Sequence, residues 1–298
     1  MDPNSAGMAA CLVISDTGHV LLQYLLQAVD FKSAQLASLV ATLQQFSRGQ
    51  AMAMVALYRY VIVVLSDETA PVLVAIVCFS ETDAALARLA GMHLLHECLR
   101  FFGTAALHRL VADLKAGAEA QSASYTLSAA LQGQGSTDGT LNSFASFEAA
   151  VVEPFFDRLP ALVALLGANA FFVNCHLREA VASQPPPPAL VAAVTDVAGA
   201  SPLRLATART RGSCAHTYVA LAASGVPGFC AAVVYAGPDA WFDGAASAGA
   251  SVPAAPAWTV LQDVRDASAR ADLARLCEPF GHPPTPPDSP RPPELAKH

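Results

Sequence analysis

Apolar and polar positions along residues 10–79 form a succession of short segments. Two apolar runs come first and are joined by a turn at Asp16, Thr17 and Gly18. A segment with helical spacing follows at 33–46, and three more apolar runs continue to residue 79. Runs rich in Val, Ile and aromatic residues between turn residues are typical of strands. The pattern predicts a strand–strand–helix–strand–strand–strand order, which is an antiparallel meander interrupted by one helix.

The helical segment at 33–46 has one apolar stripe that we expect to be buried on the sheet. Its members recur at offsets of three, four, seven and ten residues: Leu36, Leu39, Val40, Leu43 and Phe46. A long helix over 81–102 and a second helix over 104–116, separated by Gly103, are expected to close the sheet on one side.

The same order of elements returns from Ala170. Two strands, a helix and three strands are predicted, followed by a final helix over 261–277. The fold class is therefore α/β, of the α+β type, with two units that each form an antiparallel five-stranded sheet flanked by helices. The expected boundaries are 8–117 for the first unit, 118–146 for a flexible linker, 147–168 for connecting helices, 169–278 for the second unit and 279–298 for a disordered Pro-rich tail.

Three stretches carry a resemblance to a known family. The hairpin CLVISDTGHVLLQY, the run YVIVVLSDETAPVLVAIVCF and the helix ALHRLVADLK resemble longin domains and, more loosely, roadblock-type domains. Two such units make the chain similar to the tandem longin-domain trafficking proteins, either the Fuzzy-like type or the subunits of the late-endosomal Rab exchange factor. The resemblance implies two longin-like domains.

The resemblance also implies a function. It indicates a non-catalytic subunit of a cytosolic membrane-traffic or ciliary-traffic complex, with no enzyme activity of its own. Its partners would be another longin-domain protein, bound as a heterodimer, and a Rab-like small GTPase, with guanine-nucleotide exchange as one activity of such a complex. The expected location is the cytoplasm, with peripheral association at endomembranes or the ciliary base. A structural module of a larger assembly such as an axoneme is an alternative.

Composition excludes several function classes. Only 14% of residues are charged, the net charge is −7, and the 17 Lys and Arg residues are scattered, which argues against nucleic acid as a partner. The longest apolar stretches, such as 72–79, are far shorter than the roughly 20 residues that span a bilayer. Seven Cys residues, an odd number without a CxxC pair, suit a reducing compartment.

Candidate chemistry is sparse. His93, His96 and Cys98 lie close together on the helix over 81–102, but a helical wheel places Cys98 on the apolar side. The wheel places His93, His96, Glu97 and Arg100 on the solvent-facing side, so no metal site is predicted. The chain has none of the common phosphate-loop, dinucleotide, hydrolase or zinc-protease motifs, and no cofactor is expected.

Two short segments remain as candidate sites. Cys214 and His216 would share one face of a strand and are the residues on which a loop-built thiol enzyme would depend, although no third orienting group is evident. Tyr58, Arg59 and Tyr60 stand at a tight turn and belong to residue types that are enriched at binding hot spots. They are the partner-binding candidates, and a hairpin whose tyrosines only pack on the sheet is an equal alternative.

Overall fold

The protein is described from a computed structural model. The structure describes residues 7–46, 52–57, 59–80, 84–120, 144–167, 170–198, 203–209, 215–238, 258–261 and 267–281. The chain divides into two compact units, Met1–Ala161 and Leu162–His298, and each is described by itself. Most of the expected linker and nearly all of the expected Pro-rich tail lie outside the described residues.

The first unit contains a sheet in which the described strands follow the order β2-β1-β5-β4-β3, and every described pair is antiparallel. The predicted order of strands and helix along the chain is confirmed. The strands are β1 (Met8–Ser15), β2 (Val20–Leu25), β3 (Met52–Leu57), β4 (Tyr60–Ser66) and β5 (Val72–Cys78), and the helix α1 (Ser33–Phe46) lies between β2 and β3 in the chain.

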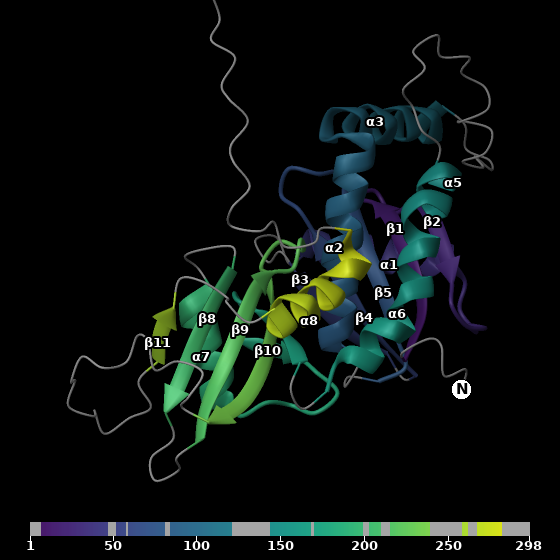
Figure 1. Ribbon diagram of the computed structural model, residues 1–298. Coiled ribbons are helices and arrows are strands. Elements are labelled where there is room, and N and C mark those ends of the chain that lie inside the picture. Colours follow the sequence, from purple (N-terminus) through teal and green to yellow (C-terminus); the bar gives the residue numbers. More distant parts are fainter. Residues whose placement is uncertain are drawn as a thin grey trace, which may run out of the picture. The chain divides into compact units, whose positions relative to one another are not determined.

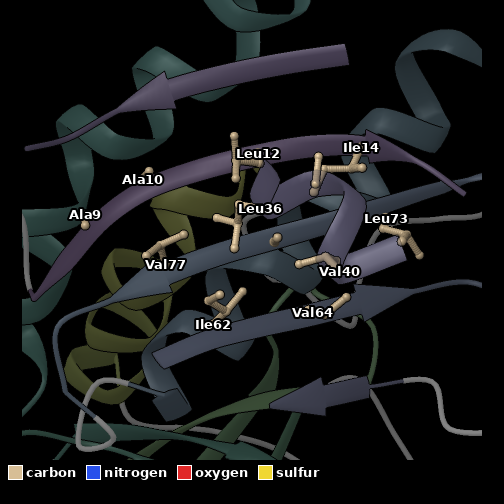
Figure 2. Packing of buried hydrophobic residues seen from close by; sticks show 12 residues of the cluster. Ala9, Ala10, Leu12, Ile14, Leu36, Val40, Ile62, Val64, Leu73 and Val77 are labelled. Atoms are coloured by element: carbon tan, nitrogen blue, oxygen red, sulfur yellow. The ribbon is translucent and has the colours of Figure 1, made fainter. Parts of the chain in front are cut away.

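Alternate residues of the central strands β1, β4 and β5 lie on opposite faces of the sheet and pack in different layers. Leu12 of β1, Val64 of β4 and Val77 of β5 lie on the face that α1 covers, and Figure 2 shows these side chains directed toward Leu36 and Val40 of the helix. The residues between them face α2, which packs on β4 and β5. The three strands are therefore buried along nearly their whole length.

The buried stripe of α1 is rotated from the expected one. Leu36 and Val40 are buried as expected, but Ala37 and Ala41 complete the contact and Leu39 is 39% exposed. The two alanines are small, so this flank of the helix can rest close to its neighbours. The expectation that Leu39 is buried is wrong. The side chain of Phe46 lies outside the described residues.

Helix α2 (Ala84–Phe102) covers the opposite face of the first sheet. It approaches the strands closely at Gly91, where a Cβ would lie 2.0 Å from Cδ1 of Leu65. The helix ends at Gly103, whose φ of +77° is the left-handed conformation common just beyond helix ends. Helix α3 (Thr104–Ala120) follows, four residues longer than expected. The break predicted at Gly103 is confirmed.

A further helical segment of the first unit packs against α2 and β2. It consists of α5 (Phe144–Phe147), the π-helical turn η3 (Glu148–Val152) and α6 (Glu153–Leu165), which runs across the division between the units. Phe155 lies on His93 of α2 with ring centroids 4.9 Å apart, and Phe156 stacks on Tyr24 of β2 at 5.4 Å. Helix α2 is therefore covered on both sides.

The second unit repeats the order of the first and adds a strand. Within the described residues its sheet has the order β11-β8-β9-β10-β6-β7, so the fold class is confirmed and one edge carries a strand that was not expected. The elements are β6 (Ala170–Asn174), β7 (Glu179–Val181), α7 (Pro188–Ala198), β8 (Leu203–Arg209), β9 (Ala215–Ala223), β10 (Phe229–Pro238), β11 (Trp258–Leu261), α8 (Ala267–Cys277) and the 3₁₀ turn η5 (Glu278–Phe280).

Two helices cover the second sheet. Val191 and Val194 of α7 join a core with residues of β6, β9 and β10. On the other side α8 packs on β9 and β10, and Phe280 meets Phe172 edge to face at 5.4 Å. The described part of the final helix begins at Ala267, and Leu261 belongs to β11 instead of the helix that was expected over 261–277.

Candidate partner-binding surface

The turn between β3 and β4 is held by a small polar cluster. Arg59 donates from Nη1 to Oδ2 of Asp30 at 2.7 Å, and the hydroxyl of Tyr60 donates to Oδ1 of the same carboxylate at 2.5 Å. Asp30 lies in the segment between β2 and α1, so one carboxylate joins two parts of the chain that are about thirty residues apart. Tyr58, the third candidate at this turn, lies outside the described residues.

The charges in this cluster shift two pKa values in opposite directions. The hydrogen bond from Tyr60, supported by the positive charge of Arg59, lowers the pKa of the Asp30 carboxyl below its ordinary value. The same hydrogen bond raises the pKa of Tyr60, because ionisation of the phenol would place a second negative charge against Asp30. The pair is most stable with a charged Asp30 and a neutral Tyr60.

Tyr60 and Arg59 have different surroundings. The ring of Tyr60 packs edge to face on Phe31 at 5.4 Å and lies 5.6 Å from Phe79, so this side chain ties the loop before α1 to the sheet. Arg59 is 66% exposed in its side chain and remains available to a partner. The structure therefore brings Arg59 and Tyr60 together around Asp30, and their role in partner binding stays a prediction.

Strand β3, beside this turn, forms the free edge of the first sheet. Within the described residues no strand pairs with its outer side. The strand reads MAMVAL, without a charge or a proline, and its pairing with β4 runs without a bulge. Met54 is 46% exposed and Leu57 is 40% exposed. An apolar edge without bulges is normally covered by another chain or protected by charges or prolines.

The opposite edge of the same sheet is formed by β2 and differs in two ways. Helix α5 and the turn η3 pack beside β2, and Tyr24 of this strand is engaged by Phe156. The register of β1 with β2 also shifts between Val13 and Ile14. Bulges and adjacent helices protect a sheet edge. Of the two edges, β3 is the one suited to accept another strand.

The solvent-facing assignment of two residues on α2 is wrong. His93 and Glu97 are both 5% exposed, because the α5–η3–α6 segment covers the side of α2 on which they lie. Glu97 accepts hydrogen bonds from Arg100, with Nη2 at 2.7 Å. Among the described residues, no group of three or more His, Cys, Asp or Glu side chains could hold a metal ion.

The thiol residues show no catalytic arrangement in the described part of the chain. Cys214 and the side chain of His216, on which a loop-built thiol enzyme would depend, lie outside it. Burial raises the pKa values of Cys98 and Cys277 to about 12, so both thiols are protonated at neutral pH. Cys175 differs, because a hydrogen bond with the Cys230 thiol lowers its pKa to about 7.

Sequence reasoning missed Asp30 and the exposed apolar residues of the β3 edge. Asp30 gave no signal, since a single acidic residue in a loop is ordinary. The run from Met52 to Leu57 did give one, because it lacks the alternation of apolar and polar residues that a half-buried strand shows. Such a run at the end of a sheet indicates that something covers it.

Three comparisons with known proteins were made, with protein families, curated proteins and solved structures. No protein-family model matches the chain, and no curated protein matches it. A solved Roadblock/LC7 domain from Streptomyces avermitilis is similar over 32% of this chain and 83% of that domain, with 17% sequence identity and a TM-score of 0.27. In the described residues, no helix is long and apolar enough to cross a membrane.

Proposed function

We propose that the chain is a non-catalytic subunit of a protein complex and that a partner chain adds a strand to β3. The observation that carries this proposal is the β3 edge: no described strand pairs with its outer side, the strand contains no charged residue, and two of its apolar side chains are exposed. Main-chain hydrogen bonds to a partner strand would supply affinity, and side-chain pockets would supply specificity.

The side chains along β3 fit contacts on both faces of an extended sheet. Met54 stands opposite Val63 and belongs to the face that α2 covers, where Arg88 approaches its sulfur at 4.0 Å. Leu57 stands opposite Tyr60 and belongs to the face that α1 covers. A partner strand along β3 would therefore meet one apolar anchor on each side, and Arg59 would add a charged group at the end of the strand.

Helix α1 offers a second surface for the same partner. Leu39 is exposed and lies about 160° around the helix from Ala41. Gly18 of the β1–β2 turn approaches the helix at Ala41 and Ser38, so Leu39 faces away from that turn. A partner that extends the sheet at β3 and packs on α1 would cover this leucine. Two sets of contacts make a specific complex more stable than strand pairing alone.

The family resemblance suggests which partners the complex would contain. The partner would be another longin-domain chain, and the resulting heterodimer would engage a Rab-like small GTPase in membrane or ciliary traffic. Nucleotide exchange would be one activity of the complex. The proposal gives no role to Cys214 or His216, so it does not depend on either residue.

The test is affinity co-purification of the full chain from cells, followed by quantitative mass spectrometry. Wild type is compared with Met54→Lys/Leu57→Lys, which places two charges on the β3 edge, and with Leu177→Lys, a matched change at a leucine that is 48% exposed in the turn after β6. We expect the edge variant to lose a longin-domain partner at least tenfold while the control keeps it. Equal recovery of the same partner with all three chains would refute strand addition at β3.

The response of binding to the nucleotide on the GTPase distinguishes this proposal from its alternatives. A trafficking subunit should bind its GTPase differently when the complex is loaded with GDP or with a non-hydrolysable GTP analogue. A structural module of an axoneme-like assembly should be incorporated regardless of the nucleotide and resist high salt. A thiol enzyme should instead lose a measurable activity when Cys214 is alkylated.

A further inference from the structure

Two cysteines of the second unit lie on the same face of its sheet. Cys230 belongs to β10 and pairs with Val173 of β6. Cys175 is the first residue after β6, and its amide donates to the carbonyl oxygen of Gly228 at 2.8 Å. Side chains two residues apart on a strand share a face, so Cys175 and Cys230 are diagonal neighbours across the two strands. Both lie in the core that α7 covers.

The sulfur of Cys175 is directed back toward Cys230. Its Sγ lies 3.9 Å from the carbonyl oxygen of Val173, the residue that pairs with Cys230. The two thiols are also joined by a hydrogen bond. This bond lowers the pKa of Cys175 to about 7 and raises the pKa of Cys230 well above its ordinary value, because the Cys230 thiol donates to a thiolate at Cys175. Near neutral pH the pair therefore combines a thiolate and a thiol.

The two sulfurs differ in their access to solvent. Cys175 is partly exposed in the turn after β6, whereas Cys230 is 6% exposed. The thiolate is the form of cysteine that reacts with oxidants, and oxidation follows thiolate character and exposure. An accessible thiolate beside a buried thiol is the arrangement in which the first cysteine is oxidised and the second closes a disulfide.

A third cysteine of this unit is less suited to the same reaction. Cys277 belongs to α8, which packs on β9 and β10 from the face opposite α7 (Figure 1). Its thiol donates to the carbonyl oxygen of Ala223 at 3.5 Å, and burial raises its pKa to about 12. Cys277 is therefore protonated and shielded at the pH at which Cys175 is reactive.

We propose that Cys175 and Cys230 form a peroxide-sensitive site, at which Cys175 is oxidised first and a reversible disulfide with Cys230 follows. In the first step the Cys175 thiolate attacks one oxygen of hydrogen peroxide, so that an S–O bond forms, the O–O bond breaks and the departing hydroxide takes a proton from solvent to become water. The sulfur is thereby oxidised by two electrons to a sulfenic acid. In the second step the Cys230 sulfur attacks Cys175: the S–S bond forms, the S–O bond breaks, and the hydroxide leaves with the proton of the Cys230 thiol as water.

Closure of this disulfide needs a small movement of the turn. Diagonal residues of an antiparallel pair have Cα atoms about 7–8 Å apart, and a disulfide spans up to about 7 Å. Cys175 lies just beyond the end of β6, so the turn can take up the difference while the pairing of Ala170–Asn174 is kept. Accessible disulfides of this kind are readily reduced, which suits transient formation in a reducing compartment.

The disulfide would enclose α7, β8 and β9 in one covalent loop. Such a cross-link restricts the unfolded chain, so the oxidised second unit should be harder to unfold than the reduced one. The site is independent of strand addition at β3, which belongs to the first unit.

The experiment treats the full chain with a small molar excess of hydrogen peroxide at neutral pH. The parent carries Cys214→Ser, so that a thiol outside the described residues cannot exchange, and linked peptides are identified by mass spectrometry after alkylation. Cys11 and Cys98 are the internal control, because they are neighbouring thiols that are both buried and whose pKa values burial raises. We expect a Cys175–Cys230 disulfide that dithiothreitol removes and that forms at least tenfold faster than the control pair is oxidised.

Two variants separate the roles of the two sulfurs. Cys230→Ser keeps a hydrogen-bond donor beside Cys175 but removes the second sulfur, so oxidation should stop at a sulfenic acid that dimedone traps. Cys230→Ala removes the donor as well, and Cys175 should then be oxidised more slowly than in the serine variant. Peroxide should raise the midpoint of urea unfolding, followed by tryptophan fluorescence, in the parent and in neither variant. Cooperative unfolding of the reduced variants in the same assay shows that the second unit is folded.

Several results would overturn the inference. They are the absence of a Cys175–Cys230 disulfide, a disulfide of Cys175 with Cys277 or with a second chain instead, oxidation of the control pair at the same rate, and a urea midpoint that the disulfide leaves unchanged. None of these results alters the co-purification outcome for the β3 variant, which tests the proposed function separately.

Discussion

Gly91 allows a direct test of how closely α2 lies on the first sheet. A Cβ at this position would lie 2.0 Å from Cδ1 of Leu65 and 3.3 Å from Cγ1 of Ile76. Ordinary carbon contacts are about 3.5–4.0 Å, so Leu65 would have to move by roughly 1.5 Å. Leu65 is 1% exposed and Ile76 is fully buried, which leaves little room for that movement.

Two effects of opposite sign decide the result of Gly91→Ala. Overpacking of a tight core costs about 1–3 kcal/mol. Replacing Gly by Ala in a helix interior stabilises by about 0.8–1.0 kcal/mol. Since the overlap here exceeds what a small shift can relieve, we expect overpacking to dominate and the first unit to lose about 1–2 kcal/mol of unfolding free energy. The helix term can be measured separately with Ala112→Gly on the exposed side of α3.

The same substitution should change sign when Leu65 is shortened. Leu65→Ala alone should cost about 2–5 kcal/mol, because it removes buried apolar atoms and leaves a cavity. In that background the methyl group introduced by Gly91→Ala no longer meets Cδ1, partly fills the cavity and keeps the helix benefit, so a gain of about 0.5–1 kcal/mol is expected. The assay is hydrogen exchange of the slowest amides in β4 and β5, because both tryptophans, Trp241 and Trp258, belong to the second unit. Two results would show that α2 does not lie this close to Leu65. One is a Gly91→Ala substitution that does not destabilise the wild-type background, and the other is a change in unfolding free energy with the same sign in both backgrounds.

Further outcomes are expected at other positions. Asp30→Asn should lower the titration midpoint of Tyr60 in the tyrosinate absorbance, with Tyr60→Phe as the reference, because the raised pKa of Tyr60 depends on that carboxylate. The pKa of Asp30 is lowered in the folded state, so its contribution to stability is present at neutral pH and is lost as acid protonates the carboxylate. The pKa of Tyr60 is raised in the folded state, so its contribution is present at neutral pH and is lost as alkali deprotonates the phenol. Among the described cysteines, Cys175 should react first with iodoacetamide near pH 7, as followed by peptide mass spectrometry, and Cys230→Ala should slow that reaction. Gly228→Ala should destabilise the second unit by about 1–2 kcal/mol in urea unfolding followed by tryptophan fluorescence, because φ is +79° there and a Cβ would lie 2.9 Å from the His176 ring.

The order of strands and helices could be predicted because local signals decide it. Turn residues such as those at Asp16–Gly18 end the apolar runs, and helical spacing at 33–46 separates the hairpin from the meander. The same reasoning worked in the second unit, where sequence identity to the first unit is low but the pattern recurs. Element order is thus encoded within short windows of the chain.

Burial on the helices could not be predicted as well, because it depends on segments far away in the sequence. A helical wheel places His93 and Glu97 opposite the apolar side of α2 and gives no information on α5, η3 and α6, which cover them. The wheel also predicts burial for the more apolar Leu39 in preference to Ala37, although Ala37 is buried and Leu39 is exposed. The burial of polar residues such as His93 and Glu97 can be recognised only once the helical segment that covers them is known.

Strand β11 was missed for a different reason. Trp258, Thr259 and Val260 are strand-forming residues, but four residues are too few to show a period, and they follow a segment rich in Ala, Gly, Ser and Pro. The strand is defined by its partner β8 and not by its own sequence. Edge strands of this length can be recognised only once the sheet that they extend is known.

The outer strands of the two sheets also bear on the size of the complex. A chain with two open edges of the same kind can bind one partner at each edge, and contacts that do not close on themselves propagate into chains or fibres. Within the described residues, β2 and β3 are the outer strands of the first sheet, and β7 and β11 are those of the second. Strand addition at β3 would therefore end with a single pair only if the other outer strands accept no partner strand.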